Sequence, residues 1–186
     1  ICRKEQEPHR IFIKNNLNHI VPFLHRDLNK WRDALHYGLK ARFNKSNIIL
    51  RGGIDDVCQN IKTKELVIVD FKSQATNVSV EPISYFESPY HESYKIQLDF
   101  YAYLFQTMGF KMSPIAYLLV VNAKRNEERF NGKIIFTETL LPYKWKIDWI
   151  PNQVQKMLDT MNSKSIPESH KSCMNCAYAD QYTLAV

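Results

Sequence analysis

Two short stretches decide the fold of this chain: GGIDDV at residues 52–57 and VIVDFK at residues 67–72. Each has the apolar, β-branched composition of a strand, and each carries an aspartate at or near its end. The polar residues 59–64 lie between them, which predicts a hairpin-like pair of strands. Residues 67–69 do not alternate with polar residues, so we expect the second strand to be buried on both faces.

The two aspartates, Asp55 and Asp70, are candidate metal ligands. Mg²⁺ is typically bound through one or two carboxylates, with water and substrate phosphate completing its shell. Side chains alternate along a strand, so Lys72 faces the same way as Asp70 and can stabilise charge on a phosphate. The carbonyl of Phe71 is a further candidate ligand. The alternative is a solvated strand edge at Asp70 and a turn at Asp55. The combination favours phosphodiester hydrolysis as the hypothesis to test.

The rest of the chain alternates between helical and strand patterns. Residues 28–43 carry apolar side chains at three- and four-residue spacings, which predicts an amphipathic helix in a polar, helical N-terminal third. A second helix is predicted to end at Gly109, a favourable C-terminal cap. After residue 43 we predict strands at 48–58, 65–73, 115–122 and 133–140, a loop at 74–94, and helices at 94–108 and 143–161. This order predicts one α/β domain with a mixed sheet.

The predicted helix at residues 94–108 adds two side chains to the candidate site. Gln97 and Tyr101 are four residues apart, so they project from one face of that helix. An amide and a phenol on this face can contact substrate phosphate or hold the metal ligands in place. The alternative places Tyr101 in the packed stripe of the helix with Tyr94, Leu98 and Phe105.

Composition narrows the class of protein. The chain has 186 residues, 45% hydrophobic and 24% charged, which are values of an ordinary globular domain. No apolar run approaches the roughly 20 residues of a membrane-spanning helix. Its net charge of +6 is compatible with a polyanionic partner. The chain begins with Ile, so we expect the native N-terminus to be missing, which leaves a targeting peptide open.

The ordered motifs Gly-x-Ile-Asp-x-Val, Val-Asp-Phe-Lys and Gln-x-x-x-Tyr resemble the PD-(D/E)XK nuclease superfamily. The similarity covers roughly residues 28–122. Within that superfamily it is to the RecB-like branch, which includes nuclease domains of recombination helicase-nucleases and of CRISPR adaptation. The resemblance implies a restriction-endonuclease-like fold: a mixed central β-sheet flanked by helices. We therefore expect residues 1–186 to form one such domain, with a core at about 28–140 and a helix and cysteine-containing tail at 143–186.

The resemblance also implies an activity. It makes Asp55 and Asp70 ligands of Mg²⁺ or Mn²⁺, Lys72 catalytic, and Gln97 and Tyr101 the residues that complete the site. The implied reaction is metal-dependent cleavage of DNA, with exonuclease favoured over endonuclease, on single strands or duplex ends. The implied setting is intracellular DNA repair, recombination or processing, in the cytoplasm, nucleoid or an organelle matrix, with a helicase or larger complex as partner. The alternative is a degenerate module that binds DNA or a protein without cutting.

The chain departs from the family pattern at a histidine and at the cysteines. Many RecB-like members carry a metal-binding histidine on the first core helix, where this chain has His36, but without the usual upstream glycine. Some members hold an iron–sulfur cluster with one N-terminal and three C-terminal cysteines. Cys2, Cys173 and Cys176 match three of these, and no fourth cysteine follows. His170 completes a candidate zinc set. Metal-free reduced thiols are the alternative, and we expect Cys58 to be a core residue.

Two further groups of residues are candidates for contacts with the substrate. Basic residues before and after the third predicted strand can contact phosphate: Lys111, Lys124, Arg125, Arg129 and Lys133. The alternative is a charged loop that is only solvated. Aromatic residues of the 74–94 loop can stack on bases of a single strand or pack the loop down: Tyr85, Phe86, Tyr90 and His91. Glu87 and Glu92 are candidate metal ligands if that loop folds over the site.

Overall fold

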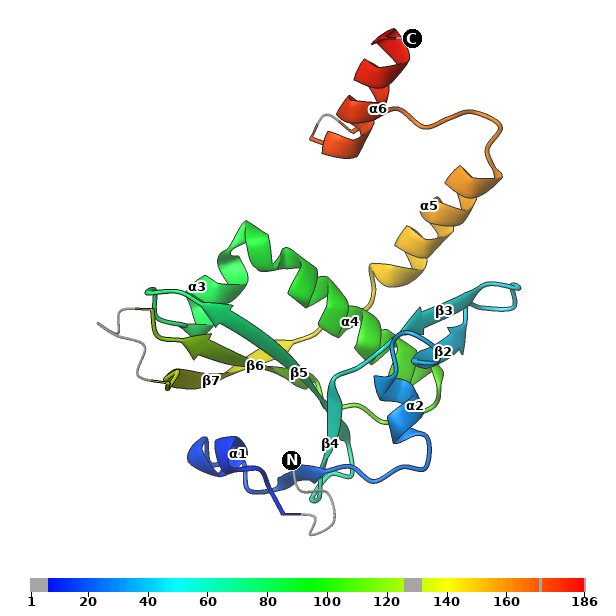
Figure 1. Cartoon of the computed structure of the whole chain (residues 1–186). Coiled ribbons are helices and arrows are strands. Elements are labelled where there is room, and N and C mark those ends of the chain that lie inside the picture. The colour runs from blue at the N-terminus through cyan, green and yellow to red at the C-terminus, as the bar shows by residue number, and fades with distance from the viewer. Residues whose placement is uncertain (1–6, 126–131, 171, 186) are drawn as a thin grey trace. The chain divides into compact units, whose positions relative to one another are not determined.

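The computed structural model describes residues 7–125, 132–170 and 172–185. The described residues up to 148 form one compact unit, and those from 149 onward form a second. The first unit contains the elements that carry the candidate site (Figure 1). In chain order these are α1 (Arg10–Lys14), β1 (Ile20–Pro22), α2 (Leu28–Arg32), β2 (Leu39–Arg42), β3 (Ile49–Gly52), β4 (Asp56–Asn60), β5 (Leu66–Ala75), α3 (Pro82–Glu87), the 3₁₀ turn η1 (Pro89–His91), α4 (Glu92–Thr107), β6 (Ile115–Ala123) and β7 (Phe136–Lys144).

A five-stranded mixed sheet is the centre of this unit. Its strand order is β1-β4-β5-β6-β7, with β5 and β6 parallel and the other neighbours antiparallel. The connection from β5 to β6 runs through α3 and α4, as a parallel pair requires a crossover. This architecture confirms the predicted mixed α/β sheet flanked by helices.

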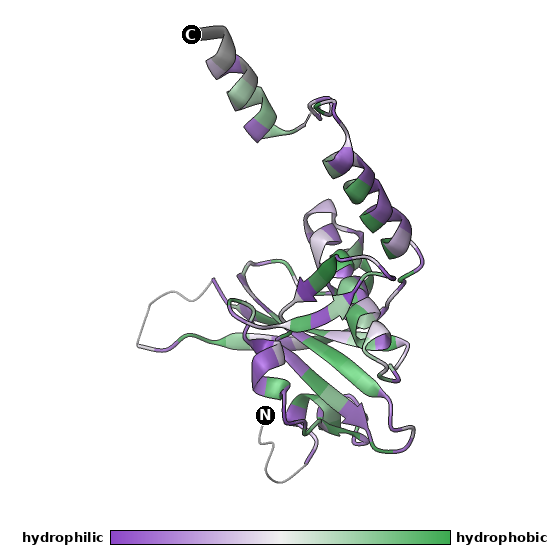
Figure 2. Cartoon of the chain, turned by 90° about the vertical axis from the view of Figure 1, so that its right-hand side faces the viewer, coloured by the Kyte–Doolittle hydropathy of each residue, from purple (hydrophilic) through white to green (hydrophobic). Residues whose placement is uncertain are grey.

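Strand β5 is buried on both faces, as its uninterrupted apolar run predicts. Ile68 packs toward α4 in a cluster with Leu98 and Phe105. Its neighbours Val67 and Val69 point the other way, into a cluster with Phe12 of α1. Figure 2 shows hydrophobic residues concentrated in the strands of this sheet. The period of two therefore puts Asp70, two residues after Ile68, on the α4 face of the sheet.

The predicted helix at residues 28–43 is wrong. The helix α2 ends at Arg32, and a turn leads into β2, which pairs with β3 in a separate two-stranded sheet. Gly38 has φ = 71°, a left-handed conformation that a helix interior does not contain. From Leu39 onward the residues alternate between buried and exposed, with Leu39 and Ala41 inward, which is the period of a strand.

Several predicted boundaries also change. The strand predicted at residues 48–58 is two strands in different sheets, because the chain leaves β3 at Gly52 and enters β4 at Asp56. The loop predicted at 74–94 contains α3 and η1, each begun by a proline that is preorganised for a first helical turn. The N-terminal third holds two short helices and β1. Helix α4 and its end before Gly109 (φ = 90°) are confirmed.

The second unit consists of two helices, α5 (Ile150–Asn162) and α6 (Met174–Ala185). Helix α5 starts seven residues later than predicted, because β7 continues to Lys144. Apolar side chains lie on one side of α5, and two of them, Ile150 and Val154, are buried (Figure 2). None of the described helices is both long enough and apolar enough to cross a membrane.

Candidate active site

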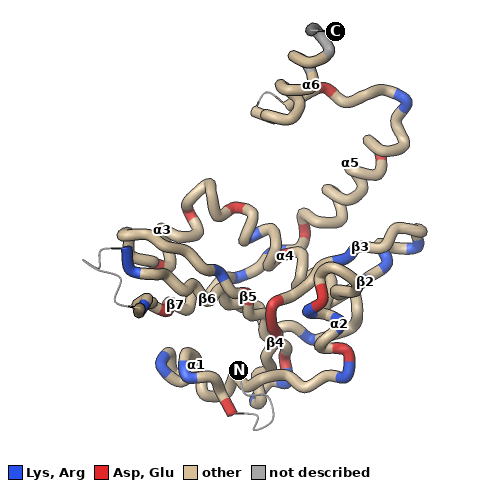
Figure 3. Tube along the Cα trace, viewed as in Figure 1, with Lys and Arg blue, Asp and Glu red and all other residues tan. Residues whose placement is uncertain are grey.

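The register of the β4–β5 hairpin brings the two aspartates together. Asp56 pairs with Val69, so Asp55, one residue earlier, lies opposite Asp70. The backbone N–H of Phe71 donates a 2.8 Å hydrogen bond to Oδ2 of Asp55, which holds the Asp55 carboxylate beside β5. Figure 3 shows the acidic residues at the beginning of β4. Two carboxylates from neighbouring strands therefore share one side of the sheet.

Asp70 is completely buried, and apart from the Lys72 ammonium no described residue donates a hydrogen bond to its carboxylate oxygens. Its partner is Lys72, whose Nζ lies 2.5 Å from Oδ2 as an ion pair. Buried acceptors without donors are costly. A divalent cation is a group that satisfies such oxygens, and the hard oxygen donors of Asp55 and Asp70 suit Mg²⁺ or Mn²⁺.

A chain of hydrogen bonds connects Lys72 to helix α4. Nζ of Lys72 donates to Oε1 of Gln97 at 3.0 Å, and Nε2 of Gln97 donates to the phenol of Tyr101 at 2.7 Å. The Tyr101 hydroxyl in turn donates to the carbonyl of Gly53. Only one orientation of the Gln97 amide lets its oxygen accept from Lys72 and its nitrogen donate to Tyr101. Four of the predicted site residues, Asp70, Lys72, Gln97 and Tyr101, are linked in one network.

Close packing fixes the Gly53 end of this chain. A Cβ on Gly53 would lie 2.3 Å from Cβ of Ala34, and a Cβ on Gly52 would lie 3.0 Å from the Tyr101 ring. The turn that contains Ala34 is held to β3 by a 2.6 Å bond from Arg51 to the Ala34 carbonyl. The two glycines allow the backbone to pass between this turn and α4, which places Asp55.

We expect Tyr101→Phe to destabilise the protein by about 1–3 kcal/mol. The substitution removes the only atom that links Gln97 to the Gly53 carbonyl, leaving buried polar groups without their partner. Urea unfolding monitored by fluorescence measures the change. Tyr90→Phe is the matched control, because that tyrosine is 89% exposed and should lose almost nothing. Equal effects of the two substitutions would contradict the packing role of the Tyr101 hydroxyl.

Tyr94 contacts the site, although the sequence analysis names it only in the alternative of a packed helix stripe. Its ring centroid lies 4.8 Å from Nζ of Lys72, a cation–π contact. The signal was present in the sequence, because Tyr94 lies three residues before Gln97 and so on the same helix face.

Burial raises the pKa of Asp70 to about 6, the charge of Asp55 adds to this shift, and the Lys72 ammonium opposes it. The folded protein therefore favours protonated Asp70 more than the unfolded chain does. This stabilising contribution is complete below about pH 3.9 and is lost as the pH rises through about 6.

Without divalent metal, we expect the free energy of unfolding of wild type to fall by about 2–3 kcal/mol between pH 4 and pH 7, relative to that of Asp70→Asn. Urea unfolding in EDTA across this range gives the difference between the two proteins. Taking the difference removes the contributions of other carboxylates. Stability curves that run parallel would contradict the raised pKa.

Other predicted ligands lie away from the two aspartates. His36 is in a turn rather than on a helix, and its Nδ1 lies 3.1 Å from Asp33. Glu92 is ion-paired with Lys95. In the described part of the chain, no three His, Cys, Asp or Glu side chains form a group that could hold a metal, so neither His36, Glu87 nor Glu92 joins Asp55 and Asp70.

The cysteines do not form a metal cluster in the described residues. Cys173 and Cys176 are free and adjacent, with the Cys176 N–H 3.4 Å from Sγ of Cys173. Nδ1 of His170 lies 2.9 Å from the hydroxyl of Ser172. Cys2 lies outside the described residues. Cys58 is buried in the core, as predicted.

A family model of the PD-(D/E)XK nuclease superfamily matches residues 3–181. The chain belongs to this superfamily. Membership of the PD-(D/E)XK superfamily supports a nuclease that hydrolyses phosphodiesters with divalent metal, and nucleic acid as the substrate. The mixed sheet with its flanking helices agrees with the superfamily fold. The comparisons found no matching curated protein and no matching solved structure.

Proposed function

We propose that this PD-(D/E)XK protein is a metal-dependent DNA nuclease of the RecB-like type. The observation that carries the proposal is the convergence of Asp55 and Asp70 with Lys72 on one side of β5, next to Gln97 and Tyr101. These groups come from the residue before β4, from β5 and from α4, and they form a single contact network. A scaffold has no need for a fully buried carboxylate beside a second carboxylate.

Asp55 and Asp70 would hold Mg²⁺ or Mn²⁺, with the Phe71 carbonyl as a further oxygen donor. When bound, the metal lowers the pKa of water and screens charge on the phosphate. A bound metal would also lower the cost of ionised Asp70, because it would add a second cationic partner to Lys72 for this buried carboxylate.

Lys72 would act on the reacting phosphate. An ammonium has three N–H donors, and the Asp70 and Gln97 contacts occupy two of them. The third is left for the attacking water or a non-bridging phosphate oxygen, where negative charge develops. Gln97 and Tyr101 are positioning residues: they hold the ammonium through directed hydrogen bonds that end on the Gly53 carbonyl.

The biological setting follows from the RecB-like resemblance. We propose exonuclease rather than endonuclease action, in repair, recombination or processing of intracellular DNA, with a helicase or larger complex as partner. The competing proposal is a catalytically degenerate module that binds DNA or a protein. The complete pair of carboxylates with Lys72 favours the enzyme.

End-labelled single-stranded and duplex DNA, incubated with Mg²⁺ or Mn²⁺ and separately with EDTA, tests the proposal. We expect cleavage with either metal and none with EDTA. Linear and circular substrates separate exonuclease from endonuclease action. A wild-type protein that leaves every substrate intact while still binding DNA would support the degenerate module instead.

A further inference from the structure

We propose that the strand adjoining the scissile phosphate is bound unpaired, in a groove between residues 74–79 and η1, with one base stacked on Tyr90. This inference rests on the proposed nuclease function and specifies its substrate as single-stranded DNA. Two neighbouring hollows form the groove. The first has a volume of about 610 Å³ and is lined by Gln74, Ser79, Tyr85, Tyr90 and His91 among others. The second has a volume of about 520 Å³.

The first hollow adjoins the catalytic groups. Gln74 lies two residues after Lys72 on the same strand, so both side chains face the same way. On the other side, the His91 ring stacks on Tyr94 at 5.3 Å, and Tyr94 contacts the Lys72 ammonium. A strand whose phosphate reaches Lys72 therefore passes directly over this hollow.

Tyr90 is the aromatic side chain available to a base. Tyr85 is buried, donates its hydroxyl to Gln74, and stacks on His91 at 3.9 Å. His91 contacts both Tyr85 and Tyr94, whose ring centroids lie 3.9 and 5.3 Å from its own. Phe86 packs against Tyr143. These three therefore pack the segment down, while Tyr90 in the middle of it stands 89% exposed at the rim of the hollow.

The chemistry of the two hollows differs in a way that suits a nucleotide strand. The first is lined mainly by hydroxyl and aromatic groups, with the Gln74 amide, Val78 and the Glu81 carboxylate among them, and it has no Lys or Arg. Hydroxyls both donate and accept, so they suit the edges of a base. The second hollow includes Lys124 and Arg125 with the hydroxyls of Thr137 and Thr139, which suit a phosphate.

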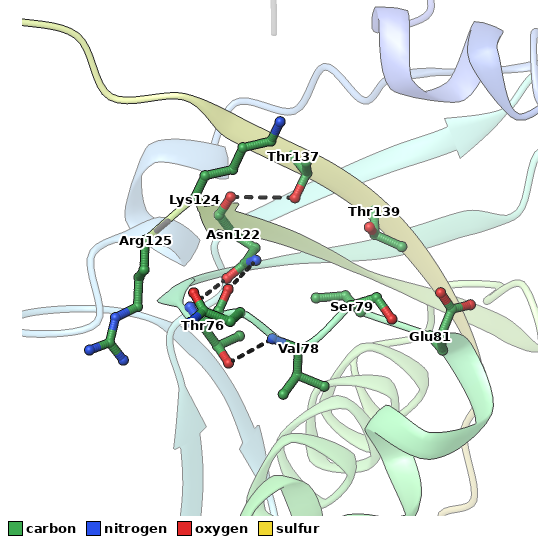
Figure 4. A pocket seen from close by; sticks show the side chains of 11 residues that line it. Thr76, Val78, Ser79, Glu81, Asn122, Lys124, Arg125, Thr137 and Thr139 are labelled. Atoms are coloured by element: carbon green, nitrogen blue, oxygen red, sulfur yellow. Dashed lines mark hydrogen bonds between the residues drawn. The ribbon is translucent and has the colours of Figure 1, made fainter. Parts of the chain in front are cut away.

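The wall between the hollows is well anchored. Both hollows share Thr76, Val78, Ser79 and Glu81. The Asn122 side chain accepts from the Thr76 N–H and donates to its carbonyl, each at 3.0 Å (Figure 4). Figure 4 also shows Glu81 at the end of the second hollow away from Lys124 and Arg125.

Inside a duplex both faces of each base are covered by its neighbours, so only an unpaired base or the last base of a duplex end can stack on Tyr90. Stacking on an exposed tyrosine with hydroxyl contacts also carries little sequence preference. The groove therefore selects single strands, or the frayed end of a duplex, without selecting a sequence.

Fluorescence anisotropy with a labelled 12-nucleotide oligo(dT) and a 12-base-pair duplex, in EDTA so that nothing is cut, tests the groove. We expect wild type to bind the single strand more tightly than the duplex. Tyr90→Ala should weaken single-strand binding about tenfold, Tyr90→Phe should retain it, and Tyr178→Ala, an exposed tyrosine of α6, is the matched control.

Replacing Lys124 and Arg125 together by Ala should reduce the salt dependence of single-strand binding by about 1.4 in slope, which corresponds to two phosphate contacts. Replacing Lys156 and Lys164 together by Ala removes the same charge elsewhere and should leave the slope unchanged. Circular dichroism confirms that each variant is folded.

Unchanged single-strand affinity in Tyr90→Ala, or a wild type that prefers the duplex, would overturn the inference. The two proposals fail separately. A protein that cleaves DNA but ignores Tyr90 keeps the nuclease function and loses the groove. A protein that binds through Tyr90 but never cleaves keeps the groove and loses the nuclease function.

Discussion

Asp70→Asn should lower the rate of metal-dependent DNA cleavage by about a thousandfold or more. Asp70 is the fully buried member of the carboxylate pair, and in the described structure its oxygens have no hydrogen-bond donor besides the Lys72 ammonium. Losing its charge removes a metal ligand and with it several kcal/mol of transition-state stabilisation. Initial rates on a 5′-labelled single strand, at saturating Mg²⁺, measure the loss.

A thermal shift gives a second readout for Asp70 that does not depend on activity. A metal that binds only the folded protein raises its melting temperature with concentration. We expect Mg²⁺ to raise the melting temperature of wild type and to have little effect on Asp70→Asn. Asp159→Asn, a carboxylate of α5 outside the site, should behave like wild type in both assays. Full activity or an undiminished thermal shift in Asp70→Asn would exclude Asp70 as the ligand.

Lys72→Met should lower the cleavage rate by about 10²–10³ while keeping the response to metal. Methionine preserves the length and apolar stem of the side chain but removes the charge that meets Gln97, Asp70 and the Tyr94 ring. The magnitude is that of losing one positioned group that stabilises developing negative charge.

The metal response separates Lys72 from Asp70. Without its ammonium the two carboxylates repel more strongly, so Mg²⁺ should raise the melting temperature of Lys72→Met at least as much as that of wild type. Lys156→Met, which removes an exposed lysine of α5, is the control and should cleave normally. A Lys72→Met protein that cleaves at the wild-type rate would remove Lys72 from the mechanism. If Mg²⁺ no longer raises the melting temperature of Lys72→Met, the role of Lys72 is structural.

Much of the candidate site could be predicted from local patterns. The unbroken apolar run before Asp70 indicated a strand buried on both faces, and α1 and α4 do cover it. The alternation of strand side chains placed Lys72 beside Asp70, and the four-residue spacing placed Gln97 and Tyr101 on one helix face. Each of these inferences uses a period fixed by backbone geometry, which is why sequence sufficed.

The spacing of apolar residues gave a wrong prediction where both a helix and a helix–turn–strand segment are compatible with it. Residues 28–43 have apolar side chains at helical spacings, yet the chain forms a short helix, a turn and a strand. The helical interpretation gave too little weight to Gly38, whose positive φ ends any helix there. Tyr85, Phe86 and Tyr90 looked equivalent in sequence. Only packing separates the buried ring of Tyr85 and the partly buried ring of Phe86 from the exposed ring of Tyr90.

The sequence by itself determined the order of the motifs, the periods of β5 and α4, and with them which residues can face the site. The tertiary structure decided that Asp55 lies opposite Asp70, that Tyr101 reaches the Gly53 carbonyl, and that Lys72 rests on Tyr94. The reason is physical. A period sets the direction of a side chain along its own element, whereas register and contact depend on how separate elements pack, which no local pattern contains.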